Sequence, residues 1–325
     1  MKKLMAILAI MICAVSLVSC GKANDNKVVI YSCMEEVRSQ YFVDKLNKQF
    51  PNYKIDLQYM STGNLGAKLK AEGEKSECDI ILALESSYLI QNEESLADLS
   101  SYPTDKYLDN ILPKNKKYLP IERDAASIII RTDLLKEKGL QEPKSYQDLL
   151  KPEYKGLISM PNPKSSGMGY AFLKSLVNAY GEDEAFKYFD ELSKNITQFT
   201  SSGSGPVNAL VQGEAVIGMG MTFQAVNEIN AGIPLKILVF EEGSPNTICG
   251  FAMLKGRDTK TAVKAVFDYI NEVLIYDDKE LFVPDQIFKE QENTIANYPK
   301  DIKYSDMSSD DAVTEKAELL SKWTH

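Results

Sequence analysis

The sequence predicts an α/β protein of two lobes, each a mostly parallel β-sheet flanked by helices. Short apolar strands alternate with helical stretches along the chain, and no hairpin turns separate them, which is the pattern of parallel sheets. The chain also has 325 residues, more than a single hydrophobic core usually holds. We therefore expect two lobes.

The amino terminus has the features of an export signal. Two lysines precede an apolar stretch over residues 4–18, which is shorter than the ~20 residues that a membrane-spanning helix needs. The run ends at Cys20, in a context that resembles a bacterial lipobox, and this implies cleavage before Cys20 and a lipid on its thiol. We expect a lipoprotein signal peptide over 1–19, and a lipidated cysteine with a flexible tether over 20–27. The alternative is an uncleaved membrane anchor.

The first lobe contains three predicted strands, each followed by small polar residues. The strands cover 27–31, 54–59 and 78–84, and the helices between them run to Phe50, where Pro51 stops the first, and over 65–72. A ligand of a parallel sheet binds outside the carboxyl ends of its strands. Ser32, the group 61–63 and the pair 86–87 stand at those ends, although such residues also cap helices without binding anything.

The second lobe repeats this pattern between two crossings of the chain. Ser165-Ser166-Gly167 and Ser204-Gly205 each precede a predicted helix, and a proline at 206 is favoured at a first helical position. Free N–H groups and the positive dipole end make such sites suited to anions. An ordinary capped helix is the alternative. The predicted strands of this lobe cover 125–131, 156–160, 215–222 and 236–240, and a strand over 247–254 returns to the first lobe. The predicted helices cover 143–150, 170–179, 185–192 and 223–231, with another that begins at Pro206, and the carboxyl tail is mainly helical.

Composition excludes several classes of function. The net charge of -9 argues against nucleic-acid binding, which needs a basic surface. The single histidine, His325, is the last residue, so neither a Ser-His-Asp triad nor a histidine-rich metal site can form. We expect no catalytic residues, no resident metal and no cofactor. Cys33, Cys78 and Cys249 allow at most one disulfide, and buried free thiols are the simpler interpretation.

The pattern resembles the extracellular solute-binding proteins of ABC importers, in the branch related to iron(III)-binding proteins. The residues that carry the resemblance are Cys20, 28–31 followed by Ser32, 79–84, 143–150, 159–169, 208–214, 240–245 and 250–254. It implies a periplasmic-binding-protein type 2 fold, in which two crossover strands join the lobes and the lobes close on a ligand like a hinge. The expected lobes are 27–124 plus 251–325, and 125–250. The implied partners are a small solute, an ABC permease and, through the lipid, the outer face of the cytoplasmic membrane, and we expect a monomer.

The resemblance also bears on the ligand. Iron binders of this branch carry an adjacent tyrosine pair where this chain has Met221-Thr222-Phe223, which argues against tyrosyl iron binding. Other members bind phosphonates, phosphorylated sugars, thiamine or small organic anions at helix N-termini. We therefore predict a receptor for a small phosphonate or phosphorylated solute. An iron(III) receptor, a hydrolytic enzyme on the same fold and an adhesin are the alternatives.

The candidate ligand-binding residues come from the strand ends and helix starts described above, with a few charged residues added. Arg123 or Lys164 would add a charge-assisted bond to an anion. Glu85, with Glu241 or Glu242, would hold an amine or sugar hydroxyls on the far side. The full set is Ser32, Cys33, Ser61, Thr62, Gly63, Glu85, Ser86, Arg123, Ser165, Ser166, Gly167, Ser204, Gly205, Thr222 and Glu242.

Overall fold

The computed structural model describes residues 26–300, 302–307, 309 and 312–325. The predicted signal peptide, the lipidated Cys20 and most of the tether lie outside these residues. Within the described part of the chain, no helix is both long and apolar enough to cross a membrane.

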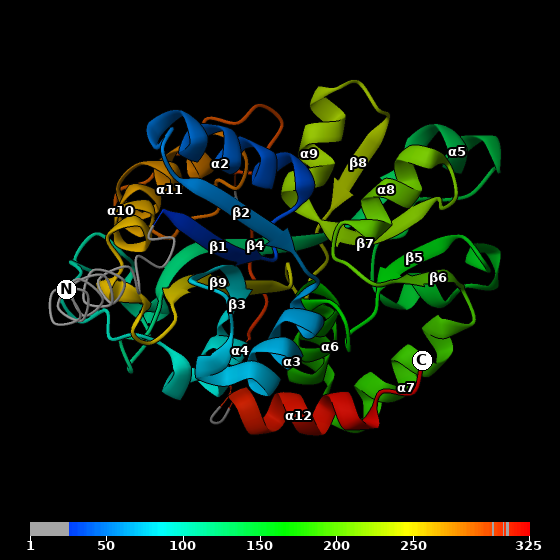
Figure 1. The fold of residues 1–325 in the computed structure, drawn as a ribbon. Helices are drawn as coiled ribbons and strands as arrows, with labels where there is room; N and C mark the ends of the chain where they lie inside the picture. Colours follow the sequence, from blue (N-terminus) through cyan, green and yellow to red (C-terminus); the bar gives the residue numbers. More distant parts are fainter. Residues whose placement is uncertain (1–25, 301, 308, 310–311) are drawn as a thin grey trace, which may run out of the picture.

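A curled mixed sheet runs through the whole molecule (Figure 1). Its strands follow the order β2-β1-β3-β9-β4-β7-β5-β6, and β8 pairs with β4. The strands are β1 (Lys27–Ser32), β2 (Lys54–Tyr59), β3 (Ile80–Glu85), β4 (Leu119–Arg131), β5 (Ile158–Pro161), β6 (Ile196–Thr200), β7 (Ile217–Met221), β8 (Leu235–Leu238) and β9 (Asn246–Met253). Parallel pairs form each end, β1 with β2 and β3 on one side and β5 with β6 and β7 on the other.

Strands β4 and β9 connect the two parallel parts. They pair antiparallel with each other from Leu119 to Ala125 of β4. From Ala126 onward β4 pairs instead with β7 and β8. The long strand β4 thus belongs to both sheets, and the predicted two-lobe fold with two crossover strands is confirmed. The predicted lobe boundaries stay a prediction.

The first lobe is a sheet with helices on both faces, because its strands are apolar on both sides. Val28 and Ile30 of β1 share one core with Phe42, whereas Val29 and Tyr31 share another with Leu65. This alternation is the period of two expected of a strand. The flanking helices are α2 (Glu36–Gln49), α10 (Thr261–Tyr269) and α11 (Ile275–Leu281) on one side, and α3 (Thr62–Glu72) and α4 (Ser86–Gln91) on the other.

The second lobe follows the same rule around β4. Ile128 packs in the core that contains Phe172, and Ile129 packs in the core that contains Val207 and Leu210. The helices are α5 (Thr132–Glu137), α6 (Gly167–Tyr180), α7 (Glu182–Ser193), α8 (Gly205–Gln212) and α9 (Thr222–Asn230). The segment 143–150, predicted as a helix, forms only a 3₁₀ turn over Gln147–Leu150, started by a hydrogen bond from the Asp148 amide to Ser145 Oγ at 3.2 Å.

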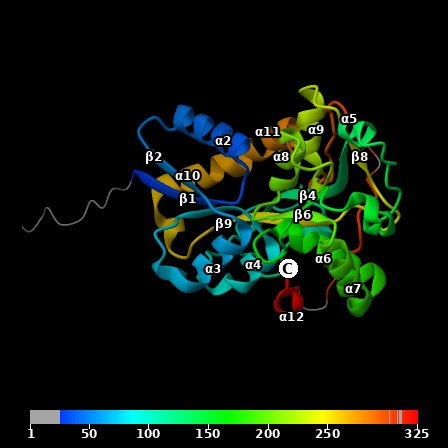
Figure 2. The ribbon, with the colours of Figure 1, turned by 90° about the vertical axis from the view of Figure 1, so that its right-hand side faces the viewer.

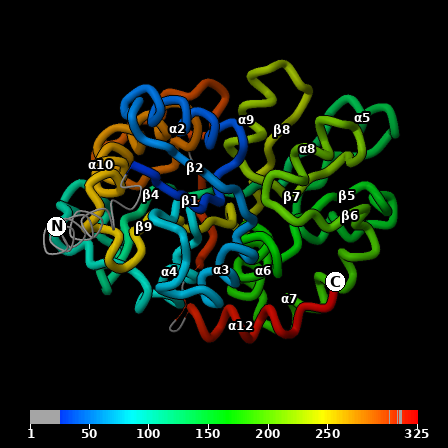
Figure 3. The backbone as a smooth tube through the Cα atoms, in the orientation of Figure 1, coloured from blue at the N-terminus to red at the C-terminus, as the bar shows by residue number. Residues whose placement is uncertain are grey.

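The carboxyl tail returns along both lobes. Helix α12 (Ala312–Lys322) runs from the α3–α4 side toward α7, as Figures 1 and 3 show, and in Figure 2 it lies lower than α6 and to the left of α7. Lys316 contacts Glu85 of the first lobe, and the Trp323 ring packs against Phe189 of the second, with ring centroids 5.3 Å apart. The tail therefore contacts both lobes.

Candidate ligand-binding site

A cavity lies where the two lobes and the crossover strands meet. Its volume is about 40 Å³, room for a few water molecules in this conformation, so it suits a compact solute. The lining residues come from strand ends, helix starts and the crossover strands. They are Cys33, Glu35, Tyr59, Ser61, Thr62, Ala83, Glu85, Glu122, Asp124, Ser165, Ser166, Gly167, Met168, Ser202, Gly203, Ser204, Met221, Thr247 and Cys249.

The first lobe contributes the carboxyl ends of β1, β2 and β3. The register of β3 against β9 shifts between Ile81 and Leu84, and Ala83 has a φ of 57°, in the left-handed region that residues other than glycine seldom adopt. Such irregularities concentrate beside binding sites, where they redirect a strand. Here the irregularity brings Ala83 and Glu85 to the same cavity.

Three helices begin at the cavity. Helix α3 starts at Thr62, α6 at Gly167 and α8 just after Ser204. First-turn amides have no partner within their own helix. In α6, the Ser166 hydroxyl accepts a hydrogen bond from the Gly169 amide at 3.3 Å. The two amides before it, of Gly167 and Met168, keep no acceptor among the described residues.

Among the cavity-wall amides that have no acceptor within the described residues, five lie at the helix starts or in the loop just before α8. They belong to Thr62, Gly167, Met168, Gly203 and Ser204. The hydroxyl of Ser61, also on the wall, is buried and without a partner. Together these groups are hydrogen-bond donors that both lobes contribute to the cavity wall.

One helix-start amide is already engaged. The Gly63 N–H donates to the Ser165 carbonyl at 3.2 Å, a contact between α3 and the loop before α6. A side chain at Gly63 would not fit, because its Cβ would stand 2.6 Å from the Lys164 carbonyl oxygen. The two lobes are therefore in direct contact at one edge of the cavity.

The crossover strands form the floor. Glu122 and Asp124 are two residues apart on β4, and Glu122 stands opposite Cys249 of β9. A ligand atom from each of the three lies within 4.8 Å of the others. All three side chains are buried.

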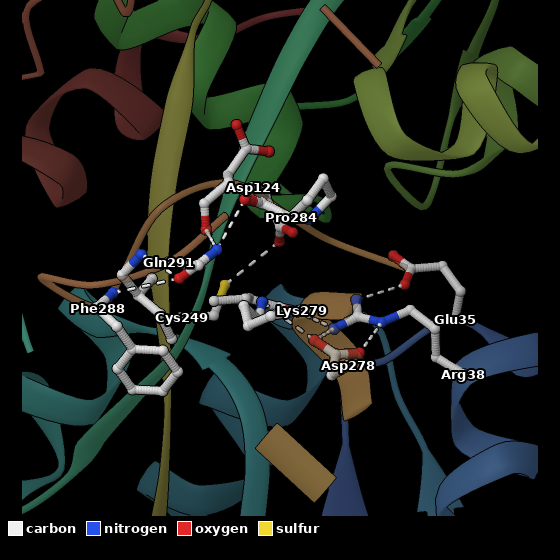
Figure 4. Close-up of polar contacts among 12 residues, drawn as sticks. Glu35, Arg38, Asp124, Cys249, Asp278, Lys279, Pro284, Phe288 and Gln291 are labelled. Carbon is white, nitrogen blue, oxygen red and sulfur yellow. Dashed lines mark hydrogen bonds and ion pairs between the residues drawn. The ribbon is translucent and has the colours of Figure 1, made fainter. Parts of the chain in front are cut away.

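A buried guanidinium supports this floor from the side of α2 (Figure 4). Arg38 is 1% exposed and donates to both carboxylate oxygens of Asp278, each at 2.9 Å. It also donates to Glu35 at 3.0 Å and to Glu122. Burial alone would raise the pKa of Asp278, but the charges of Arg38 and Lys279 outweigh it and hold that pKa below its usual value.

Asp124 is the most weakly hydrogen-bonded of the four carboxyl groups in and around the floor, which are Glu35, Glu122, Asp124 and Asp278. Burial, followed by repulsion from Glu122, raises the pKa of Asp124 well above its usual value, although Arg38 opposes this. Its Oδ2 accepts only a long contact from the Cys249 thiol at 3.6 Å, and its Oδ1 has no partner. Burial and the neighbouring Asp124 also raise the pKa of Cys249 well above its usual value, so its thiol is protonated.

Just over half of the predicted binding residues line the cavity. The eight are Cys33, Ser61, Thr62, Glu85, Ser165, Ser166, Gly167 and Ser204. Glu85 is not free for a ligand, because it accepts hydrogen bonds from Lys316 and from both the amide and the hydroxyl of Ser87.

The other predicted residues stand off the cavity wall. Gly63 and Gly205 lie beside it with their amides engaged. Thr222 bonds the Ser127 hydroxyl at 2.7 Å, and Glu242 accepts from Tyr180. The remaining three are Ser32, whose hydroxyl accepts from the Met34 amide at 3.0 Å, Ser86, and Arg123, whose guanidinium stacks over the Tyr304 ring at 4.8 Å.

Sequence reasoning missed the floor and parts of the wall. A signal for the floor was present: Glu122, Arg123 and Asp124 interrupt an otherwise apolar strand, and charges inside a buried strand require a reason. The lining residues not predicted are Glu35, Tyr59, Ala83, Glu122, Asp124, Met168, Ser202, Gly203, Met221, Thr247 and Cys249.

Comparison with known proteins decides the family. A family model described as a bacterial extracellular solute-binding protein matches residues 85–273. The chain belongs to this family. It is therefore an exported solute-binding protein of an ABC importer, a class that delivers small solutes to membrane permeases. The resemblance seen in the sequence is confirmed at this level.

Individual relatives agree with the fold. A Haemophilus influenzae protein described as uncharacterized is 26% identical over 266 residues, covering 79% of this chain and 76% of its own. The periplasmic binding protein AfuA of Actinobacillus pleuropneumoniae, solved with fructose-6-phosphate bound, superposes with a TM-score of 0.79 at 24% identity, covering 91% of this chain and 97% of its own. Iron-bound HitA of Pseudomonas aeruginosa superposes with a TM-score of 0.75 at 16% identity, covering 91% of this chain and 98% of its own.

The floor cluster is a poor match to an iron(III) site. Iron(III) is a hard ion that prefers oxygen donors, whereas one of the three groups is the protonated thiol of Cys249. Among the described residues, Tyr59 is the one tyrosine on the cavity wall. The position where iron binders carry tyrosines holds Thr222, bonded to Ser127, and Phe223, which lies under the Arg38 guanidinium at 5.3 Å.

Proposed function

We propose that this solute-binding protein captures a small solute carrying a phosphonate or phosphoryl group. The observation that carries the proposal is the set of five unengaged amides on the cavity wall, from Thr62, Gly167, Met168, Gly203 and Ser204. A phosphoryl group offers three acceptor oxygens, and backbone N–H groups at helix starts are suited to such an anion. A small, partly buried cavity strengthens these bonds, because less water competes for them than at an exposed surface.

The distribution of the amides links binding to closure. Thr62 begins α3 of the first lobe, whereas the other four amides precede or begin α6 and α8 of the second. An anion between them accepts hydrogen bonds from both lobes and so favours the closed form. A ligand shifts such an equilibrium by its differential affinity for the two states. The closed form then serves as the signal that a permease recognises.

Iron(III) is the second candidate. The floor carboxylates Glu122 and Asp124 favour a cation, and iron-bound HitA shares the fold. The protonated Cys249 thiol and the single lining tyrosine weigh against iron. AfuA, the relative solved with fructose-6-phosphate, shares the fold to a similar degree and is consistent with the phosphoryl proposal. The compact cavity favours a solute smaller than a hexose phosphate.

Isothermal titration calorimetry separates the two candidates. The purified protein is first unfolded, freed of bound solute and refolded, and then titrated with methylphosphonate, inorganic phosphate, hexose phosphates and iron(III) citrate. The proposal predicts binding of at least one small phosphonate or phosphate without metal. Binding of iron(III) alone, with no response to any phosphorus oxyanion, would overturn it.

We also propose that the protein is held at the membrane by a lipid on Cys20. The basic head, the apolar run and the Ser19-Cys20 junction support this. Fractionation of expressing cells tests it: the wild type is expected with the membranes and Cys20→Ser in the soluble exported fraction. Equal release of both proteins would contradict it.

A further inference from the structure

Asp124 places a buried carboxyl group at the cavity, and one of its oxygens has no hydrogen-bond partner. The residue is 5% exposed, it lines the cavity, and its Oδ1 has no hydrogen-bond partner. The 3.6 Å contact from the Cys249 thiol to Oδ2 only weakly offsets the cost of burying this carboxyl group. A buried carboxyl group left in this state costs free energy unless a donor reaches it, and the open side of Asp124 is the cavity itself.

Arg38 and Lys279 lie close enough to lower the pKa of Asp124, but neither forms an ion pair with it among the described residues. No lysine or arginine is among the described residues on the cavity wall. Arg38 is already shared among three other acidic side chains, and Lys279 lies 3.1 Å from one of them, Asp278. Those three are Glu35, Glu122 and Asp278. Two cations thus lie beside four carboxyl groups, and Asp124 is the one that receives no hydrogen bond from either.

We propose that the floor of the cavity binds a protonated amine of the solute, through Asp124. The solute is then a small zwitterion, an aminoalkyl phosphonate or phosphate ester with a primary ammonium at the opposite end from the phosphorus. This inference rests on the proposed function, because the five free amides take the anionic end. The two donor and acceptor sets line one compact cavity, so a short linker joins the ends.

An ammonium group suits the floor better than a metal ion. Glu122 is committed to Arg38, so Asp124 Oδ1 is the free oxygen of the cluster. Divalent and trivalent ions need four or more ligands, whereas an ammonium donates three hydrogen bonds from a single charge. One carboxyl oxygen without a partner, together with polar neighbours such as Thr247, is enough to bind an ammonium group but too few ligands for a metal ion.

Calorimetry at neutral pH tests the inference with matched probes. The wild-type protein is titrated with 2-aminoethylphosphonate, with ethylphosphonate, which lacks the amine, and with zinc or iron(III). We expect 2-aminoethylphosphonate to bind at least about tenfold tighter than ethylphosphonate, since a hydrogen bond to a buried charge contributes that much. Asp124→Asn is expected to remove this preference, because it weakens the binding of 2-aminoethylphosphonate about tenfold. The surface change Asp133→Asn, at a residue paired with Arg131, serves as the control that keeps the preference.

The outcomes are separable. Equal affinity of the wild type for the two phosphonates overturns the amine site and leaves the anion receptor standing. Binding of neither phosphonate, with binding of a metal alone, overturns both proposals. A preference that persists in Asp124→Asn overturns the assignment to Asp124. The comparison of the two phosphonates uses the wild type, so it tests for an amine site even if the variant fails to fold.

Discussion

The Gly63 N–H donates a hydrogen bond to the Ser165 carbonyl at 3.2 Å, and this bond joins the two lobes at the edge of the cavity. The backbone of Gly63 fits there because it has no side chain: an added Cβ would stand 2.6 Å from the Lys164 carbonyl oxygen and 3.2 Å from the Ser165 Cα. Separating the two lobes would break this contact.

Gly63→Ala is therefore expected to weaken ligand binding without weakening the fold. Alanine is the better helix former by about 1 kcal/mol, so the ligand-free variant should unfold at an equal or higher temperature. Its Cβ obstructs closure, and we expect at least about tenfold weaker binding, since closure is part of the binding free energy. Calorimetry and thermal unfolding of the same sample check both parts; a variant that binds as tightly as the wild type would contradict this account of closure.

The amide of Gly167 can be removed with a matched control. Proline is favoured at a first helical position, and Ser166 before it already has the extended backbone, at φ -122° and ψ 128°, that a following proline requires. Gly167→Pro deletes one N–H, whereas Gly167→Ala keeps it and adds a methyl group 3.3 Å from Thr62 Cγ2. We expect the proline variant to bind a phosphonate about tenfold more weakly than the alanine variant, as one lost charge-assisted hydrogen bond implies. Equal affinities would mean that this amide does not contact the anion.

Asp124 should reduce stability as the pH rises. Burial and Glu122 raise its pKa in the folded protein above the unfolded value, so its contribution to stability is fully present below the unfolded pKa, about 3.9, and is lost as the pH rises through the folded value. Asn stays neutral throughout. We expect Asp124→Asn to match the wild type near pH 4 and to become progressively more stable above it, by about 1 kcal/mol or more at neutral pH. Urea unfolding across this range measures the difference, and a constant gap would contradict the assignment.

The Arg38–Asp278 pair should be a main support of the cavity floor. Breaking a buried pair by removing one partner costs roughly 3–5 kcal/mol, and Asp278 is fully buried while Arg38 is 1% exposed. We expect Arg38→Met to lose stability on that scale. The control is Lys187→Met, whose partner Glu184 is largely exposed and whose loss should cost under about 1 kcal/mol. Similar losses in the two variants would show that the Arg38 cluster has no special role.

Local pattern was enough to predict the lobes and the polar wall of the cavity. Apolar strands with two buried faces dictate helices on both sides, and parallel strands bring their carboxyl ends together, so Thr62 and Ser166 could be expected near one site. Long-range pairing could not be predicted in the same way. Arg38 meets Asp278 across 240 positions, a relation that no local period encodes.

Two errors in secondary structure have simple causes. The strand β6, Ile196–Thr200, was not predicted because its polar residues and partial burial give a weak alternation. The 143–150 segment was predicted as a helix from its Ser145 cap and its two leucines. It is too short for an α-helix to be stable without tertiary support, and Pro152 ends the run soon after the 3₁₀ turn.

The central claim is that free backbone amides at three helix starts hold the anionic end of the solute. A crystal structure of the protein with 2-aminoethylphosphonate tests it most directly. We predict phosphonate oxygens within 3.2 Å, an ordinary hydrogen-bond length, of the amides of Gly167, Met168 and Gly203, with the amine turned toward Asp124. A phosphonate bound only by side chains outside this cavity, or a cavity that holds a metal ion on the floor instead, would contradict it.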